Sequence, residues 1–234
     1  MVVASLSIYP FLTDAEFDCV CRAFLRRVDA AGGPEALGWL AVSYITQDKP
    51  SQAVLRISKS VTRTHRESPA VSPVTHGNAY DEAHEQEDTI QDDDQETLVR
   101  NAINDESLEL TADYDITLSQ TYQVPVLYFV VSGIHQSGLA AIDAVYQLLV
   151  PDQHKGPLKS SGVMGGISFG YHPQSGIPAY FIHPCNTATA MRDIAGGRGV
   201  EPENYLLIWL GLVGNCINLN LSCQLFRKSS LHDS

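Results

Sequence analysis

The order of the apolar segments predicts an α+β fold, in which a four-stranded antiparallel meander sheet has helices packed on one side. An amphipathic helix comes first, and two pairs of strand-like runs follow it, separated by a long acidic segment. Consecutive strands joined by short turns pair antiparallel, and helices outside the strand runs cover one face of the sheet. The chain has 234 residues, 44% apolar and 18% charged, which suffices for a buried core in a single domain over residues 1–234.

The first element is a helix with a clear start signal. Thr13 and Glu16 stand at the two ends of a capping box, in which the Thr13 hydroxyl accepts from the third helical N–H and the Glu16 carboxylate reaches back. Apolar residues then recur on one helical face: Phe17, Val20, Cys21, Phe24 and Val28. The glycines and proline at 32–34 end the helix, and Cys21 is expected to be a small core residue.

Four strand-like runs follow this helix. Residues 39–46 and 53–60 are rich in Val, Ile, Leu and aromatic residues, and the sequence Asp-Lys-Pro-Ser between them is typical of a turn. Residues 108–118 and 124–132 form the second pair. The last run is apolar almost throughout, which places it in the centre of the sheet with a helix against at least one face.

A strongly acidic segment separates the two strand pairs. Residues 67–99 hold ten acidic residues and no Lys or Arg, so this segment carries most of the formal charge of −12. With few large apolar residues and no periodicity, it cannot bury enough surface to offset the entropy lost on ordering. We therefore expect a disordered insertion over 64–106, which acts either as a solubilising loop or as an acidic docking tether.

The second half of the chain combines helices with a long glycine-rich segment. Residues 139–149 and 203–216 have helical periodicity, and the second of these helices is apolar nearly all round, so it must be buried. Between them, residues 156–184 contain six glycines and four prolines without a stable period, which is typical of a functional or mobile loop. A short helix is expected over 188–194 and a flexible tail over 225–234.

Charge and motif content exclude several classes of protein. There is no basic excess to neutralise phosphates, so no nucleic-acid partner is expected. No apolar run reaches the ~18 residues of a membrane span, and the first residues lack the basic region of a secretory signal. The five cysteines are an odd number, which argues against a disulfide framework. We therefore expect a cytoplasmic protein with reduced thiols and no stable membrane insertion. The sequence lacks the phosphate-binding glycine loops and the His-Glu-x-x-His and Gly-x-Ser-x-Gly motifs, so neither a cofactor nor a metal is expected.

One cysteine stands apart from the other four. Cys185 follows His183 and Pro184 at the exit of the glycine-rich segment, and Asn186 or Thr187 is suited to cap the helix expected next. A cysteine just before a helix N-terminus meets oriented N–H groups and the positive end of the helix dipole, which favour the thiolate. From the residues alone, Cys185 is either a structural cysteine beside a histidine or a nucleophile.

Three segments of the chain resemble the autophagy conjugating enzymes, which are distant relatives of the ubiquitin-conjugating enzymes. Residues 171–191 contain a His-Pro pair and then the His-Pro-Cys motif that ends at Cys185, and in this family that motif carries the active-site cysteine. Residues 121–129 resemble the family's central strand. Residues 204–210, with a Trp followed by a Leu, resemble the helix after the cysteine in the branch called autophagy-related protein ten. The resemblance implies a fold like that of a ubiquitin-conjugating enzyme.

The resemblance also implies a reaction without a cofactor. Cys185 accepts the C-terminus of the ubiquitin-like autophagy-related protein twelve from the activating enzyme, autophagy-related protein seven, as a thioester, and passes it to a lysine of autophagy-related protein five. The His-Pro-Asn motif, whose Asn stabilises the oxyanion in ordinary ubiquitin-conjugating enzymes, is absent. In branch ten a Tyr of the central strand and the residue two before the cysteine take over, by position Tyr122 and His183. The alternative role of Tyr122 is that of a packed strand aromatic, and the alternative role of His183 is to orient the loop through a hydrogen bond. Asn186 is a third candidate donor.

Other interpretations remain open at this point. The branch called autophagy-related protein three conjugates ubiquitin-like proteins to phosphatidylethanolamine and also has a long acidic insertion. That branch begins with an amphipathic membrane helix, for which residues 1–11 are a poor match because they contain Pro10 and no basic side chain. A Cys185 dyad with His172 or His183 would instead make the protein a cysteine hydrolase, and an inactive site would make it a scaffold.

Overall fold

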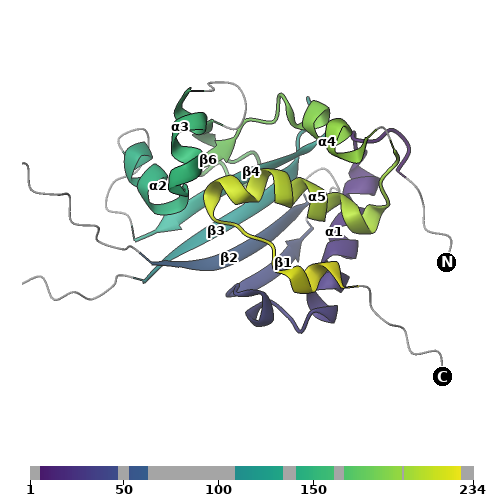
Figure 1. Ribbon diagram of the computed structural model, residues 1–234, viewed down its shortest axis with the longest axis horizontal. Helices are drawn as coiled ribbons and strands as arrows, with labels where there is room; N and C mark the ends of the chain where they lie inside the picture. The colour runs from purple at the N-terminus through teal and green to yellow at the C-terminus, as the bar shows by residue number, and fades with distance from the viewer. Residues whose placement is uncertain are drawn as a thin grey trace, which may run out of the picture. The chain divides into compact units, whose positions relative to one another are not determined.

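The computed structural model describes residues 6–46, 53–62, 109–133, 141–160, 166–196 and 198–227, and Figure 1 shows their arrangement. The insertion expected over 64–106 lies outside the described residues. The same holds for residues 228–234 of the expected tail.

The fold is built on a six-stranded antiparallel sheet with the strand order β1-β2-β3-β4-β6-β5. The strands are β1 (Ala41–Ile45), β2 (Val54–Thr62), β3 (Glu109–Leu118), β4 (Pro125–Ser132), β5 (Ile167–Tyr171) and β6 (Pro178–Ile182). Strands β1 to β4 form the predicted antiparallel meander. The predicted number of four strands is wrong, because the hairpin of β5 and β6 extends the sheet beyond β4.

This additional hairpin lies within residues 156–184, for which the sequence predicts a loop. Both strands are only five residues long, Gly170 interrupts β5, and Pro178 begins β6, so neither shows the alternation of a longer strand. Pairing with each other and with β4 makes these segments strands. Helix α3 (Asp152–Ser160) is likewise absent from the prediction, because it contains a Gly and a Pro.

The other helices follow the predicted order with small shifts in their ends. They are α1 (Asp14–Ala30), α2 (Ile142–Leu149), α4 (Thr187–Ala195) and α5 (Pro202–Val213), with the 3₁₀ helices η1 (Glu35–Leu37), η4 (Gly214–Ile217) and η5 (Cys223–Phe226). The predicted capping box is confirmed, since the Glu16 N–H donates to Thr13 Oγ1 across 3.3 Å and the Thr13 N–H donates to Glu16 Oε2 across 2.8 Å. Among the described helices, none is both long and apolar enough to cross a membrane.

One face of the sheet packs against helices and holds the core. Strand residues such as Ile57, Tyr114 and Phe129 join one apolar cluster with side chains of α1, α2 and α5, and Figure 1 shows α5 crossing the sheet. Trp209 on α5 is 1% exposed, so the predicted burial of this helix is confirmed, as is that of Cys21. These three helices share one side of the sheet, as the order of elements predicts.

The C-terminal end of the described chain is packed rather than loose. Leu225 in η5 is buried, and Arg27 Nη1 on α1 donates to the Leu225 carbonyl across 3.0 Å. The first residue of the expected tail is therefore part of the folded domain.

Residues 6–12 form a strap that runs over α4 and α5. The Tyr205 hydroxyl on α5 donates to the carbonyl of Pro10 across 2.6 Å. The Tyr9 hydroxyl donates to the carbonyl of Met191 on α4 across 2.7 Å. The strap thus ties the beginning of the chain to the helix that follows the His-Pro-Cys motif.

Candidate active site

Cys185 lies on the short segment 183–186 that joins β6 to α4. β6 is paired on both sides, with β4 through Phe181 and with β5 along its length, so this segment starts from a fixed point. Helix α4 confirms the helix predicted after the motif: it begins at Thr187, with Asn186 at the N-cap position and no capping hydrogen bond from the Asn186 side chain. Cys185 is partly exposed and forms no disulfide. Such a position suits a nucleophile better than a buried structural cysteine.

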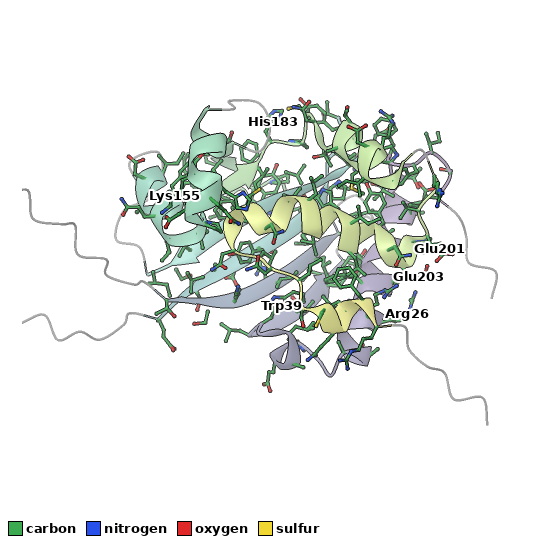
Figure 2. All side chains as sticks on the ribbon, in the orientation of Figure 1. Arg26, Trp39, Lys155, His183, Glu201 and Glu203 are labelled. Atoms are coloured by element: carbon green, nitrogen blue, oxygen red, sulfur yellow. The ribbon has the colours of Figure 1, made fainter. Side chains whose placement is uncertain are left out.

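His183 is tied to the main chain of Cys185. Its Nδ1 accepts a hydrogen bond from the Cys185 N–H across 3.2 Å. Figure 2 labels His183 near the top of the molecule. Because Nδ1 is the acceptor, the neutral ring carries its proton on Nε2. This bond gives His183 the loop-orienting role considered above. The Nε2–H group on the other side of the ring is then a hydrogen-bond donor.

Tyr122 contacts His183 although the two residues are far apart in the sequence. Their ring centroids are 5.6 Å apart and the rings meet at 76°, an edge-to-face arrangement. The expectation that Tyr122 lies on the central strand is wrong, because β4 begins only at Pro125 and Tyr122 lies in the turn before it. Its side chain is 39% exposed, so it is not a packed strand aromatic either. The structure thus brings Tyr122, His183 and Cys185 to one place.

The turn that carries Tyr122 is held from the N-terminal side of the chain. The Leu12 N–H donates to the Gln123 carbonyl across 2.8 Å, and Gln120 Nε2 donates to Asp14 Oδ1 across 3.0 Å. Gln123 has a φ of 53°, in the left-handed region that non-glycine residues seldom adopt. No sequence signal points to these contacts, because Gln and Asp are ordinary residues in surface turns. The strap and the start of α1 therefore support the turn in a way that local patterns do not reveal.

His172, the other histidine considered as a partner of Cys185, is engaged elsewhere. Its Nδ1 accepts from the N–H groups of Gln174 and Ser175 across 3.4 and 3.3 Å, and its Nε2 lies 3.5 Å from Asp115 Oδ2. The side chain is 6% exposed, and this burial lowers the pKa of the ring. Both ring nitrogens thus face groups other than the thiol, which argues against a hydrolase dyad of His172 and Cys185.

Comparison with known families identifies the family to which this chain belongs. The family model described as "Autophagocytosis associated protein, active-site domain" matches residues 16–224. The chain belongs to this family. The matched range of the autophagy active-site domain contains all six strands as well as Tyr122, His183 and Cys185.

Three curated relatives carry the name ubiquitin-like-conjugating enzyme ATG10. The protein of Gibberella zeae is 42% identical over 108 residues, that of Homo sapiens 29% over 123, and that of Dictyostelium discoideum 26% over 129. The alignments cover 46%, 50% and 50% of this chain and 44%, 53% and 55% of the relatives. The chain thus spans about half the length of the curated relatives it matches. The predicted resemblance to branch ten of the autophagy conjugating enzymes is confirmed.

Within this autophagy active-site domain, the other four cysteines lie outside the loop that precedes α4. Cys19 and Cys21 lie on α1, Cys216 on η4 and Cys223 on η5. Burial raises the pKa of the thiols of Cys21 and Cys216, which keeps them protonated. In the described part of the chain, no three His, Cys, Asp or Glu side chains are grouped to hold a metal ion. Cys185 is partly exposed and lies just before an α-helix, whereas the exposed Cys223 begins only the four-residue 3₁₀ helix η5.

Proposed function

We propose that this chain is a ubiquitin-like-conjugating enzyme of autophagy that carries its ubiquitin-like protein as a thioester on Cys185. The supporting observation is the placement of Cys185, partly exposed between a doubly paired strand and the start of α4, in a chain of the active-site domain family. The name shared by the three relatives supports the same activity. In this proposal autophagy-related protein twelve arrives from the activating enzyme, autophagy-related protein seven, and is transferred in the cytoplasm to a lysine of autophagy-related protein five.

The first step is an exchange between two thiols. The Cys185 thiolate attacks the carbonyl carbon of the thioester on the activating enzyme, a new C–S bond forms as the old one breaks, and the cysteine of the activating enzyme leaves as a thiolate. One thioester replaces another, so the exchange is nearly neutral in free energy and positioning governs its rate. The partial exposure of Cys185 suits this step, because two proteins must bring their sulfur atoms to one carbonyl.

The second step is attack by the lysine amine. Its nitrogen forms a C–N bond to the thioester carbonyl, the C–S bond to Cys185 breaks, the sulfur leaves as a thiolate, and the amine releases its proton to solvent. The tetrahedral intermediate between these events carries a negative oxygen that requires hydrogen-bond donors. We assign this role to His183 Nε2–H and the Tyr122 hydroxyl, because the two rings contact each other and His183 is bonded to Cys185.

Incubation of the full chain with activating enzyme, ATP and a tagged ubiquitin-like protein tests this function. We expect a slower-migrating band on a non-reducing gel that disappears on addition of a thiol reductant. Cleavage of the tagged protein would instead indicate a hydrolase, and an unchanged gel would indicate a scaffold. Addition of autophagy-related protein five, or of vesicles containing phosphatidylethanolamine, then separates the two branches. We expect an isopeptide-linked protein product, and a lipid product would contradict the assignment to branch ten.

A further inference from the structure

Five aromatic rings form a continuous row that ends at the site. From His172, successive ring centroids are separated by 5.0 Å to Tyr128, 5.5 Å to Phe181, 6.4 Å to His183 and 5.6 Å to Tyr122. We call these five residues the ring row. Its last two members are the groups assigned to the oxyanion, whereas its first member is a buried histidine that the proposed reaction does not use.

The register of the sheet places the middle of the ring row on the face opposite the core. Asp115 of β3 pairs with Tyr128 of β4, and Tyr128 pairs with Phe181 of β6. Cross-strand partners lie on the same face, and their sequence neighbours, such as Phe129, point to the other face and join the core. Arg56 of β2 pairs with Asp115 and continues the line. Four neighbouring strands therefore contribute to one line of side chains outside the core.

A charged pair anchors the His172 end of the ring row. Arg56 Nε donates to Asp115 Oδ1 across 2.6 Å, and its Nη2 donates to Oδ2 across 2.7 Å. The 3.5 Å between Oδ2 and His172 Nε2 is long for a hydrogen bond, so the carboxylate orients this N–H mainly through its charge. The Gln174 side chain, next to the loop amides that bind His172 Nδ1, donates to the Ala53 carbonyl across 3.3 Å. Rotation of the buried His172 ring would break its two bonds from the loop amides and turn Nε2 away from Asp115.

Phe181 links this anchor to the site. Phe181 and His183 are two residues apart along the chain that leaves β6, and their rings are in contact. Closely packed rings have few alternative positions, so loss of one ring leaves space into which the next can move. The bond from the Cys185 N–H holds the His183 ring at Nδ1. A small rotation of the ring about this atom is therefore enough to redirect Nε2–H.

We propose that His172 is a positioning residue: held by the amides of Gln174 and Ser175 and facing Asp115, it fixes the ring of His183 through the two rings between them. The inference rests on the proposed function, because the transfer step is the reaction that it affects. His172 is not a catalytic residue, since its contacts are with the loop amides, Asp115 and Tyr128.

His172→Asn is the sharpest test, because asparagine keeps an acceptor oxygen for the loop amides and removes the ring. We expect this variant to form the Cys185 thioester at the parental rate and to discharge it to free lysine about tenfold more slowly, less than the ~10²-fold cost of misplacing a reacting group by 1 Å. His154→Asn, the same exchange on α3 and outside the ring row, is the matched control and should behave as the parent in both steps. A parental discharge rate in His172→Asn would overturn the proposal.

A double variant tests whether the ring row transmits the effect. Phe181→Leu breaks the ring row in its middle. The double variant combines Phe181→Leu with His172→Asn. If His172 acts through Phe181, this double variant should discharge its thioester no more slowly than the slower of the two single variants. Losses that multiply would mean independent effects and would overturn the proposal.

The NMR signal of the His183 Hε1 proton reports the ring position directly and does not depend on activity. It should shift in His172→Asn and stay in place in His154→Asn, and an unchanged signal in both would contradict positioning.

If His172→Asn does not fold, Asp115→Asn replaces it with the same expectations, because it removes the charge that faces His172 and keeps an oxygen for Arg56. A parent chain that forms no thioester would refute the proposed function and leave the NMR test intact, so the two failures are distinguishable.

Discussion

The hydroxyl of Tyr9 donates a hydrogen bond to the main-chain carbonyl of Met191 across 2.7 Å. This bond joins the N-terminal strap to α4, the helix that starts beside Cys185. On the same helix, the guanidinium carbon of Arg192 lies 5.0 Å from the ring centroid of Phe11, a cation–π contact. The position of the cysteine segment therefore depends on residues near the start of the described chain.

We expect Tyr9→Phe to lower the free energy of unfolding by ~1 kcal/mol, the net contribution of one hydrogen bond. It should also slow discharge of the Cys185 thioester, because α4 loses a tether. Tyr44→Phe is the matched control. Tyr44 lies on β1, which is separated from β6 by three strands, and its hydroxyl donates to Asp18 Oδ1 across 2.9 Å. Urea denaturation and single-turnover discharge measure the two effects. Equal discharge rates in the two variants would show that the strap does not support the site.

Tyr122→Phe and His183→Ala should both form the thioester normally and transfer it slowly to lysine. Each removes one donor to the negative oxygen of the intermediate, and loss of such a donor costs ~10²–10³-fold in rate. Tyr171→Phe, at a tyrosine that is 75% exposed, is the matched control. Single-turnover discharge with preloaded enzyme measures the effect, and transfer at the parental rate would remove the residue concerned from the reaction.

A further variant, His183→Asp, separates the two roles of this histidine. Its carboxylate can still accept the Cys185 N–H, and it has no N–H group to donate to the oxyanion. If His183 donates to the oxyanion, His183→Asp should discharge at least as slowly as His183→Ala. Recovery of the parental rate would mean that His183 only orients the loop.

Glu16 gives the fold a defined pH dependence. Burial opposes its ionisation, but hydrogen bonds from Thr13 and Ser7 outweigh this and lower its pKa from 4.5 to about 2. A carboxyl whose pKa is lower in the folded state stabilises the fold above its unfolded pKa, and this stabilisation is lost as the pH falls from 4.5 to about 2. At pH 7 we expect Glu16→Gln to be less stable than the parent by ~1 kcal/mol, since solvent screens this partly exposed group.

Thermal unfolding between pH 2 and 7 measures this contribution. The difference between Glu16→Gln and the parent should shrink as the pH falls toward 2, where the parent carboxyl becomes protonated. Glu35→Gln, at an exposed carboxylate on η1, is the control and should follow the parent throughout. A difference that stays constant with pH would mean that the charge of Glu16 contributes nothing to the cap.

Deletion of residues 64–106 should cost little stability. Thr62 and Glu109 are paired residues of β2 and β3, so the strand ends that flank the insertion are adjacent, and the deletion leaves a three-residue hairpin loop. A shorter loop also costs less closure entropy. Urea denaturation of the two chains tests this prediction, and slowly exchanging amides across 64–106 in the full chain would contradict the predicted disorder.

The elements that the sequence predicts correctly are those whose signals are local. The capping box of α1, the long apolar runs of β2 to β4 and the all-round apolarity of α5 can each be read from neighbouring residues. Strands β5 and β6 escape prediction because Gly170 and Pro178 interrupt their patterns, and their strand character comes from pairing with β4. A single sequence contains no direct signal for that pairing.

The residues of the site also differ in whether local sequence signals identify them. Cys185 could be identified because its loop, its helix start and its motif are contiguous in the chain. The turn position of Tyr122 and the line formed by Arg56, Asp115 and Tyr128 depend on the register between distant strands. That register is set by burial of the opposite face, so the sequence shows these residues without showing that they meet.

The identity of the nucleophile is the prediction on which the function depends. Cys185→Ser replaces a good leaving group with a poor one, so any adduct becomes an oxyester that survives a thiol reductant and breaks in hydroxide, and transfer to lysine stops. Cys19→Ser and Cys223→Ser, at two cysteines with solvent access, are the controls and should keep the reductant-sensitive adduct. Non-reducing gels with and without each reagent measure the outcome. A reductant-sensitive adduct on Cys185→Ser would place the thioester on another cysteine and refute the proposed function.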